Sequence, residues 1–441
     1  ARPAPGAGDH HVNRRDLLGA LAVGGLAARG VRLPVARLRP PGDFLLLPMD
    51  DVQEAHLKAY GVAFRLLQRG GRGEWLLNHR NGSFLLPADG ELARDAALAG
   101  VVTESLGAAD ADRLRAGLAD VNADAVPLEK PPKVAVYVPP GAPPWDDAVT
   151  MALTHAGIAF DKVWDAEVLA DRLATYDWLH LHHEDFTGQY SKFYLTYAGA
   201  PWLREMVELN TRMARRLGYP NVPAAKKAVA ERIRAFVERG GFLFAMCTAT
   251  ETLDLALAAH DVDIAASYAD GSPMDPAASA KLDWSRTLAF TGAQLETSPT
   301  VAQFSDIDGH QVNSLGRRQP LGSFTLFEFS AKIDPVNTML VQDHRQVIPD
   351  FYGLTTSFLK TRIKPGVTIL ADEPGAPWAK YLHGELGQGT WTFYGGHDPE
   401  DPQHAIGDAP TDLSLHPHSP GYRLILNNVL FPAAKKKELK T

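Results

Sequence analysis

The sequence predicts an α/β protein in which a parallel β-sheet carries helices on both faces, with a smaller N-terminal α/β domain. Strand and helix patterns alternate from residue 131 onward, which is the order that crossover helices between parallel strands produce. The 441 residues exceed the length of one average domain. The 45% hydrophobic and 22% charged residues are the proportions of a globular protein that can bury a large core.

Residues 1–40 predict an export signal and a linker. Arg14 and Arg15 precede a weakly apolar run over residues 17–28, which is the pattern of a twin-arginine signal. An amphipathic N-terminal helix of a cytoplasmic protein is the alternative. The signal predicts a periplasmic or exported protein. Later apolar runs fall short of the roughly 18 to 20 residues of a membrane span, so we expect no integral membrane span after signal removal.

The small N-terminal domain is predicted over residues 41–130. A hairpin is its clearest feature, because Asn81-Gly82 is a turn signal between two strand-forming segments. Apolar positions at helical spacing follow Asp50 and Asp51, either of which can cap a helix. In chain order the expected elements are a strand at 43–49, a helix at 52–69, hairpin strands at 74–78 and 83–86, and helices at 91–98 and 109–118.

The larger domain is predicted over residues 131–432. Its strands are short apolar runs, and Gly240-Gly241 ends one of its helices. An insertion at about 262–365 is expected to cover one edge of the sheet, and residues 433–441 form a basic tail. The expected strands are at 133–138, 161–164, 176–182, 242–246, 367–370, 379–385 and 389–394, with helices at 145–156, 224–239, 248–259 and 422–430.

Cys247, the single cysteine, lies between a predicted buried strand and the start of a helix. Its sulfur would stand on a tight turn beside backbone N–H groups that favour a thiolate, which is the geometry of a nucleophile elbow. The small residues Ala245 and Ala249 let the backbone pass closely through this turn. Thr248, the next residue, is expected to contact the substrate. The alternative is a buried structural cysteine.

His397 follows the predicted strand at 389–394, and Asp398 and Glu400 come directly after it. A thiol nucleophile needs an imidazole to take its proton, and the imidazole needs a carboxylate to orient it. Cys247, His397 and either Glu400 or Asp398 supply these three groups. The alternative is a loop histidine whose acidic neighbours cap the next turn.

A third polar cluster, His180-Leu-His182-His183-Glu184, ends the strand predicted at 176–182. His180 and His182 project to one face of the strand and His183 to the other. We expect His183 and Glu184 to bind substrate. No cofactor is predicted; the alternative is a divalent metal such as zinc, which activates water. The residues of that alternative site are His182, His183, Glu184 and His397, with His416 and His418 as further candidates.

Composition excludes several classes of function. A net charge of −8 and a pI near 6.1 leave no general basic field for nucleic acid. One cysteine allows neither an intramolecular disulfide nor a thiolate-rich metal site. The glycine-rich segments fit neither a P-loop nor a dinucleotide-binding fingerprint. We therefore expect a small-molecule ligand and no nucleic acid, and the sequence does not predict the oligomeric state.

The segments 240–251 and 389–400 resemble the class I glutamine amidotransferase-like superfamily, which includes the trehalose-utilisation-type proteins. The resemblance extends over the whole larger domain and implies a flavodoxin-like fold. It also implies that Cys247 is the nucleophile, His397 the base and Glu400 the orienting acid. The elbow reads Ala-Met-Cys-Thr-Ala where the superfamily usually has Gly-x-Cys-x-Gly, and the late motif reads His-Asp-Pro-Glu in place of His-x-Glu.

Residues 48–61, 74–84 and 419–430 resemble uncharacterised bacterial proteins often labelled asparagine synthetase B. That enzyme binds ATP through a Ser-Gly-Gly-x-Asp-Ser loop, which this sequence does not contain. The resemblance therefore supports the predicted fold but not asparagine synthetase activity.

These features predict an exported hydrolase or amidase that uses a Cys-His-acid site on a small amide or ester. Two alternatives stay open. One is a non-catalytic binding or assembly protein on the same scaffold, and the other is a metal-dependent hydrolase.

Overall fold

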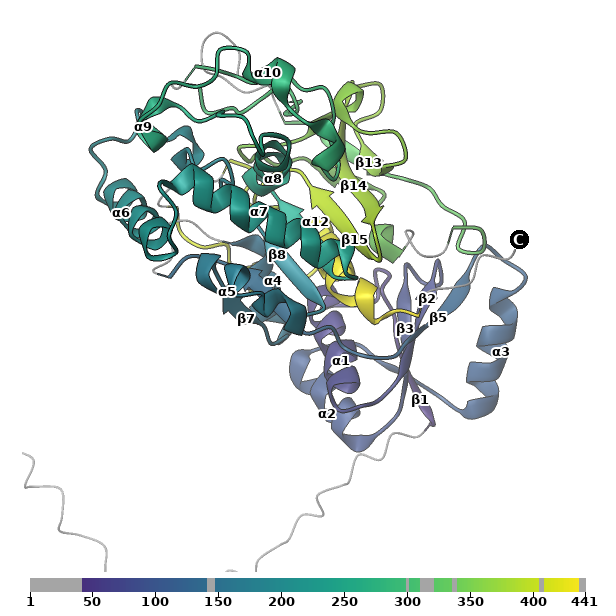
Figure 1. The fold of residues 1–441 in the computed structure, drawn as a ribbon. Helices are drawn as coiled ribbons and strands as arrows, with labels where there is room; N and C mark the ends of the chain where they lie inside the picture. The colour runs from purple at the N-terminus through teal and green to yellow at the C-terminus, as the bar shows by residue number, and fades with distance from the viewer. Residues whose placement is uncertain are drawn as a thin grey trace, which may run out of the picture. The chain divides into compact units, whose positions relative to one another are not determined.

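A computed structural model of the chain describes residues 42–140, 147–298, 301–309, 321–334, 339–403 and 408–435. The signal predicted at 1–40 and most of the tail predicted at 433–441 lie outside these ranges. The described residues form a mixed α/β structure with two β-sheets (Figure 1).

The first sheet is antiparallel, with the strand order β4-β1-β3-β2-β5. The hairpin predicted around Asn81-Gly82 is present, and both residues have positive φ, 59° and 86°, which these two residue types adopt at low cost. The strands are β1 (Phe44–Leu47), β2 (Gly73–Leu77), β3 (Ser83–Pro87), β4 (Glu104–Leu106) and β5 (Asp124–Leu128), and the helices are α1 (His56–Gln68), α2 (Gly90–Ala99) and α3 (Ala108–Leu118).

The second sheet has the strand order β11-β10-β13-β14-β15-β9-β8-β6-β7, and β12 pairs with β14 outside this path. Its strands are β6 (Val134–Tyr137), β7 (Asp161–Val163), β8 (Trp178–Leu181), β9 (Phe242–Met246), β10 (Ser323–Leu326), β11 (Val347–Pro349), β12 (Phe358–Leu359), β13 (Thr368–Asp372), β14 (Trp378–Leu386) and β15 (Gly389–Tyr394). The helices are α4 (Ala148–Ala156), α5 (Asp165–Leu169), α6 (Pro201–Arg216), α7 (Val222–Glu238), α8 (Thr248–Ala258), α9 (Ser267–Asp270), α10 (Ala278–Lys281) and α12 (Pro420–Leu430).

The prediction of a parallel sheet is wrong for one half of this sheet. β7, β6, β8, β9 and β15 are parallel neighbours, whereas β14, β13, β10 and β11 continue the sheet in antiparallel pairs. For β13, β14 and β15 the reason is the length of the connections, because only Gly387-Gln388 joins β14 to β15 and only residues 373–377 join β13 to β14. Such connections form hairpins, since parallel pairing needs a crossover of about a dozen residues or more.

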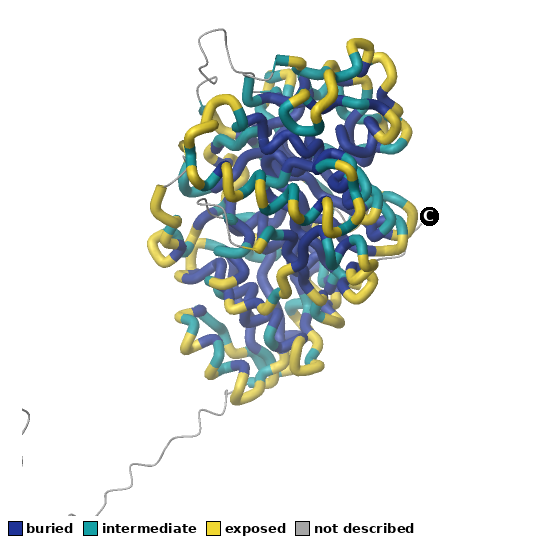
Figure 2. The backbone as a smooth tube through the Cα atoms, turned by 60° about the vertical axis from the view of Figure 1, so that its left-hand side comes forward, coloured by how far each residue is buried: buried dark blue, intermediate teal, exposed yellow. Residues whose placement is uncertain are grey.

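Side chains alternate along the parallel strands and supply two apolar cores. Trp178 of β8 and Phe244 of β9 pack on one side with α4 and α12. Leu179 and Leu243 pack on the other side with α7 and α8. Burial is nearly complete in the middle of the sheet, where the backbone is dark blue in Figure 2. Helices therefore cover both faces of the parallel strands.

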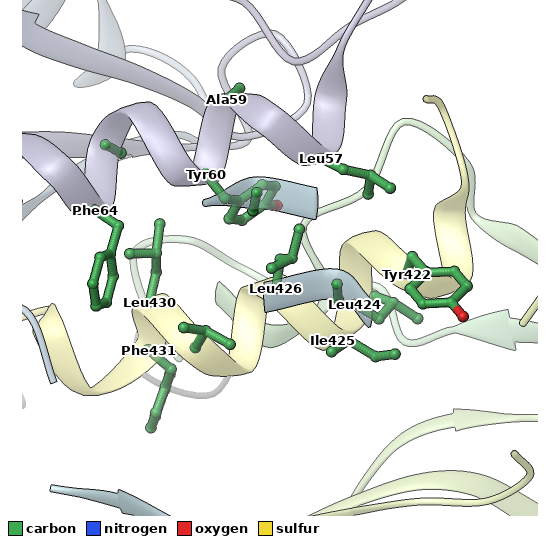
Figure 3. Packing of buried hydrophobic residues seen from close by; sticks show 14 of the residues in the cluster. Leu57, Ala59, Tyr60, Phe64, Tyr422, Leu424, Ile425, Leu426, Leu430 and Phe431 are labelled. Atoms are coloured by element: carbon green, nitrogen blue, oxygen red, sulfur yellow. The ribbon is translucent and has the colours of Figure 1, made fainter. Parts of the chain in front are cut away.

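The two sheets are joined through α1 and α12. Figure 3 shows Tyr60 and Phe64 of α1 on the side that faces Leu426 of α12. The hydroxyl of Tyr60 donates to Asn427 and accepts a hydrogen bond of 3.1 Å from Arg423 Nε. Both helices belong to one apolar cluster, so the first sheet and one face of the second share a core.

The segment predicted as an insertion, about 262–365, contributes to the sheet edge and to the second core. β10 and β11 extend the sheet beyond β13. Phe290 and Phe304 pack in the core beside α8. The carboxylate of Asp254 in α8 accepts hydrogen bonds of 2.7 to 2.9 Å from the backbone N–H groups of residues 288–290, which ties this segment to the helix. The domain boundaries predicted from the sequence stay predictions.

Candidate functional site

A pocket of about 310 Å³ lies beyond the carboxyl ends of β6 and β8. Pro139 and Pro140 follow β6, His183 and Glu184 follow β8, and all four line the pocket. β6 and β8 are neighbours in the sheet, yet the strand after β6 lies on one side of this pair and the strand after β8 on the other. Such a reversal opens a crevice in an α/β sheet, and ligands bind there.

A strained turn forms one wall of the pocket. Residues 190–192 all have positive φ, between 54° and 56°. Left-handed backbone costs a residue with a side chain roughly 1–2 kcal/mol, so three in succession need support. Asp185 provides it, because its Oδ2 accepts hydrogen bonds of 2.9 Å from the backbone N–H groups of Gln189 and Ser191. Strain that the surroundings maintain at a pocket is typical of a binding site.

The rest of the pocket is mostly apolar. Lys226 also lines it, but its charge is balanced, because Nζ lies 2.9 Å from Asp165 Oδ1 and 2.9 Å from the hydroxyl of Tyr137. Glu205, Asn210 and Arg212 of α6 add polar groups to the wall. A small cleft with a largely apolar lining and several polar groups suits a small organic ligand. The aromatic and aliphatic side chains of the wall are Trp164, Tyr190, Trp202, Met206 and Leu209.

Three imidazoles meet beside this pocket. One ring nitrogen from each of His182, His183 and His397 lies within 4.8 Å of the other two. The ring centroids of His182 and His397 are 4.3 Å apart, and those of His183 and His397 are 5.7 Å apart. The end of β8 places the first two rings and the end of β15 places the third. Three imidazoles are the protein ligands of one class of catalytic zinc site, so these residues fit a divalent metal such as zinc.

Asp147, to which the sequence prediction assigned no role, adjoins this cluster. Its Oδ1 lies 3.4 Å from Nε2 of His180 and 3.4 Å from Nδ1 of His182. The same oxygen caps α4, accepting hydrogen bonds of 2.9 Å from the backbone N–H groups of Val149 and Thr150. An aspartate directly before a helical pattern is an N-cap signal that points to this position. Asp147 lies beside the two histidines because β6, which precedes Asp147, pairs with β8.

Burial and neighbouring charges set the ionisation of the site. Burial opposes the charged form of Asp147, but His180 and His182, when they carry a proton, attract the carboxylate and hold the pKa of this carboxyl well below its usual value. Burial, together with the negative charge of Asp147, raises the pKa of Glu184 to about 8. Burial also lowers the pKa of His180. The two carboxyl groups therefore differ in acidity although both belong to the same site.

Cys247 stands at the junction of β9 and α8 with φ 50° and ψ −138°. This strained backbone is what a nucleophile elbow requires. The side chain is only 1% exposed. Sγ lies 3.3 Å from the backbone nitrogen of Leu354, which donates to it, and 3.7 Å from Oγ1 of Thr248.

The two carboxylates after His397 have other partners. Oε2 of Glu400 lies 3.0 Å from Nδ1 of His416. Asp398 accepts hydrogen bonds from the backbone nitrogen of Glu400 at 2.9 Å and from Oγ1 of Thr411 at 2.7 Å. Both groups hold the chain between β15 and α12. The structure thus brings His397 to the other histidines, while the predicted orienting acids lie in the segment that follows it.

Several residues of the pocket wall were not predicted as site residues. Trp164 comes from the connection before α5, Trp202 from α6 and Lys226 from α7. The sequence predicts a strand that ends at Trp164 and a helix that contains Lys226, but neither pattern reveals which side chains line a cavity. The strained turn at 190–192 carries no glycine, so it has no turn signal to detect.

No family model matches this sequence, and no curated protein matches it either. Solved structures provide only weak neighbours. Cytoplasmic Protein STM3548 from Salmonella typhimurium is 11% identical, with a TM-score of 0.33, over 69% of this chain and 100% of that one. A candidate GMP synthase protein from Thermoplasma acidophilum is 9% identical, with a TM-score of 0.33, over 68% of this chain and 94% of that one. In the part of the chain that the structure describes, no helix has both the length and the apolar character needed to cross a membrane.

Proposed function

We propose that this chain is a metal-dependent hydrolase of a small amide or ester, with a divalent metal such as zinc held by His182, His183 and His397. One observation carries the proposal. The three imidazoles converge to within 4.8 Å beside a pocket at the reversal point of the sheet. Glu184, which lines the same pocket, is the group that moves the proton.

The chemistry follows from these groups. A zinc ion held by His182, His183 and His397 would activate water and polarise a carbonyl group. A dication held by the three histidines would favour the ionised form of Glu184, whose pKa burial otherwise raises to about 8. As the water oxygen bonds to the acyl carbon, this carboxylate takes the proton that water loses. Glu184 then returns this proton to the leaving amine or alcohol as the C–N or C–O bond breaks. The products are a carboxylic acid and an amine or alcohol, and no oxidant or reductant is needed.

The scaffold we propose is flavodoxin-like, of the class I glutamine amidotransferase type. The order β7-β6-β8-β9-β15 supports it, because these five parallel strands then follow the order 2-1-3-4-5 along the chain. Export through the twin-arginine pathway, predicted from residues 1–40, also belongs to this proposal and places the hydrolase in the periplasm.

A second candidate is the thiol hydrolase predicted from the sequence. The elbow backbone of Cys247 favours it, as does the N–H group of Leu354 that points at Sγ. In that mechanism His397 takes the thiol proton as the sulfur bonds to the acyl carbon, and gives it to the leaving amine or alcohol as the C–N or C–O bond breaks. Water then hydrolyses the thioester, which releases the carboxylic acid and restores the thiol. The burial of Sγ and the pairing of Glu400 with His416 favour the metal mechanism instead.

Metal content and esterase activity of the full chain, purified without chelator, test the proposal. We expect a bound divalent metal and hydrolysis of simple aryl esters or amides. A chelator should abolish this activity, and zinc should restore it. His397→Ala should lose metal and reduce activity by more than about 100-fold, because it removes a ligand. The matched control, Cys247→Ser, changes another buried residue near the site and should keep both.

The other outcomes separate the alternatives. Activity that survives the chelator but disappears in Cys247→Ser would establish the thiol mechanism. Protein that holds no metal, gains no thermal stability from zinc and hydrolyses none of these substrates would support a binding or assembly protein and contradict both hydrolase mechanisms.

A further inference from the structure

We propose that Asp147, His180 and His182 form a second cation site, adjacent to the first and built from a different set of ligand atoms. The inference goes beyond the proposed function, because it depends on the geometry of these three side chains and not on catalysis. One nitrogen or oxygen atom from each residue lies within 4.8 Å of the other two.

The distances fit ligands that share a cation. Oδ1 of Asp147 lies 3.4 Å from Nε2 of His180 and 3.4 Å from Nδ1 of His182. Two atoms that each bond a tetrahedral zinc ion at about 2.0–2.1 Å are separated by about 3.3–3.4 Å. A charge-assisted N–H···O hydrogen bond is shorter, about 2.7–2.9 Å. The separations therefore match a pair of ligands better than a hydrogen-bonded pair.

The two nitrogens that face Asp147 need a partner. His180 is fully buried and His182 is 1% exposed. Within the described ranges of the chain, Nε2 of His180 and Nδ1 of His182 make no hydrogen bond. Leaving such a buried polar atom unsatisfied costs roughly 1–3 kcal/mol, so a cation that joins both nitrogens to the carboxylate relieves two such costs together.

The hydrogen bond on the other ring nitrogen of His180 shows that Nε2 is the nitrogen that can bind a cation. Its Nδ1 lies 3.0 Å from the carbonyl oxygen of Phe244, and a carbonyl oxygen only accepts, so Nδ1 carries the ring proton. In the neutral ring, Nε2 then directs a lone pair toward the carboxylate of Asp147, and the two repel unless a cation lies between them. Histidines that bind metals usually donate their other N–H group in this way, which fixes the ring as a ligand.

His182 connects the two sites. Its Nδ1 faces Asp147, which leaves Nε2 for the set formed with His183 and His397. A ring that gives one nitrogen to each of two cations has lost both of its N–H protons, so filling both sites releases protons to solvent. Because Asp147 also caps α4, the second cation links the end of β8 to the start of that helix.

Zinc stoichiometry of the full chain tests the inference, with elemental analysis after removal of free metal. We expect two zinc ions per chain in the native protein and one in each of three variants. His180→Asn keeps an amide N–H group for the carbonyl of Phe244 but lacks Nε2. Asp147→Asn remains a good helix cap but is a much weaker ligand. His397→Asn removes a ligand of the first site alone. Circular dichroism and thermal unfolding check that each variant is folded, and Asp147→Asn decides the test where His180→Asn is unfolded.

Each result distinguishes this inference from the proposed function. Two zinc ions retained in folded His180→Asn or Asp147→Asn would overturn the second site. A native protein with one zinc ion that depends on His397 but not on His180 would also overturn it, while leaving the proposed function standing. One zinc ion that depends on His180 and Asp147 but not on His397 would keep the second site and overturn the first.

Discussion

Two buried histidines show how the partner of each ring nitrogen decides what the residue does. His56 lies with Nε2 2.9 Å from the carbonyl oxygen of Asp50, so that nitrogen donates. His180 gives its Nδ1 to a carbonyl in the same way, but its other nitrogen faces Asp147. The ring of His56 packs against the rings of His344 and His418, with ring centroids 4.4 Å and 5.0 Å apart. His56 is therefore a structural residue, whereas His180 is a candidate ligand.

His56 should make the protein sensitive to acid. Burial and the positive charge of Arg423 lower its pKa from 6.5 to about 3. As the pH falls below 6.5, the unfolded chain takes up a proton that the folded chain refuses until about pH 3. The folded state therefore loses stability over this range, by up to about 1.4 kcal/mol per pH unit, or about 2 kcal/mol between pH 6.5 and pH 5.

His56→Gln tests this expectation, because glutamine can donate to the carbonyl of Asp50 but does not titrate. Urea unfolding of both proteins at pH 7 and pH 5 gives the comparison. When the pH is lowered from 7 to 5, the free energy of unfolding should fall by about 2 kcal/mol less in the variant than in the native protein. Equal losses in the two proteins would mean that His56 is not responsible. The charged and titratable neighbours Arg423, His344 and His418 are present in both proteins, so their contributions largely cancel.

At the scale of the elements, two turns decide the direction of β14 relative to its neighbours. Gly375 lies between β13 and β14 and has φ 78°, and Gly387 lies between β14 and β15 and has φ 61°. An added Cβ at Gly387 would come within 2.5 Å of the backbone oxygen of Glu238, whereas at Gly375 it would meet nothing within 4 Å. The two glycines share a conformation and differ in available space.

Alanine at these two positions should therefore have unequal effects. Gly375→Ala should lower the free energy of unfolding by about 1–2 kcal/mol, because it only places a residue with a side chain at a left-handed backbone position. Gly387→Ala should lower the free energy of unfolding by about 3 kcal/mol or more, since the main chain at the last residue of α7, Glu238, must also move. Chemical denaturation of the two variants measures the difference. Equal losses of stability in the two variants would show that the end of α7 moves aside at no cost in free energy.

At the scale of the whole molecule, α1 and α12 make the two sheets depend on each other. Leu424 and Leu426 of α12 share one apolar cluster with Tyr60 and Phe64 of α1. Arg423 is fully buried and donates to the backbone oxygen of Met49 at 2.9 Å. Separating the sheets would expose this apolar surface and leave a buried guanidinium without its acceptors.

The chain should consequently unfold as one unit, although the sequence predicts two domains. We expect a single calorimetric transition whose van 't Hoff and calorimetric enthalpies agree. A fragment that begins at residue 131 should bind a hydrophobic dye and aggregate, whereas the chain from residue 42 should not. Two resolved transitions, or a soluble fragment with native circular dichroism, would show that the larger sheet folds independently.

Local structure was largely predictable, because it depends on interactions within a few residues. Apolar runs bounded by polar turns predicted the strands β6, β8, β9 and β15, and helical spacing predicted α1, α7 and α8. Asn81-Gly82 predicted the hairpin, since few residue types adopt its backbone conformation. The same reasoning placed Cys247 at a strand-to-helix junction and put His180 and His182 on the same side of the chain, where both rings lie 3.4 Å from Asp147 Oδ1.

The sequence by itself therefore determined where the elements lie and which side chains stand at their ends. Only the tertiary structure decided which of those ends meet. The pairing of β6 with β8 brings Asp147 to His180, and the segment before α12 takes Glu400 to His416. Local patterns do not encode strand order, because order is set by the packing of helices on both faces of the sheet. A site assembled from several strand ends is for that reason a property of the fold and not of any one segment.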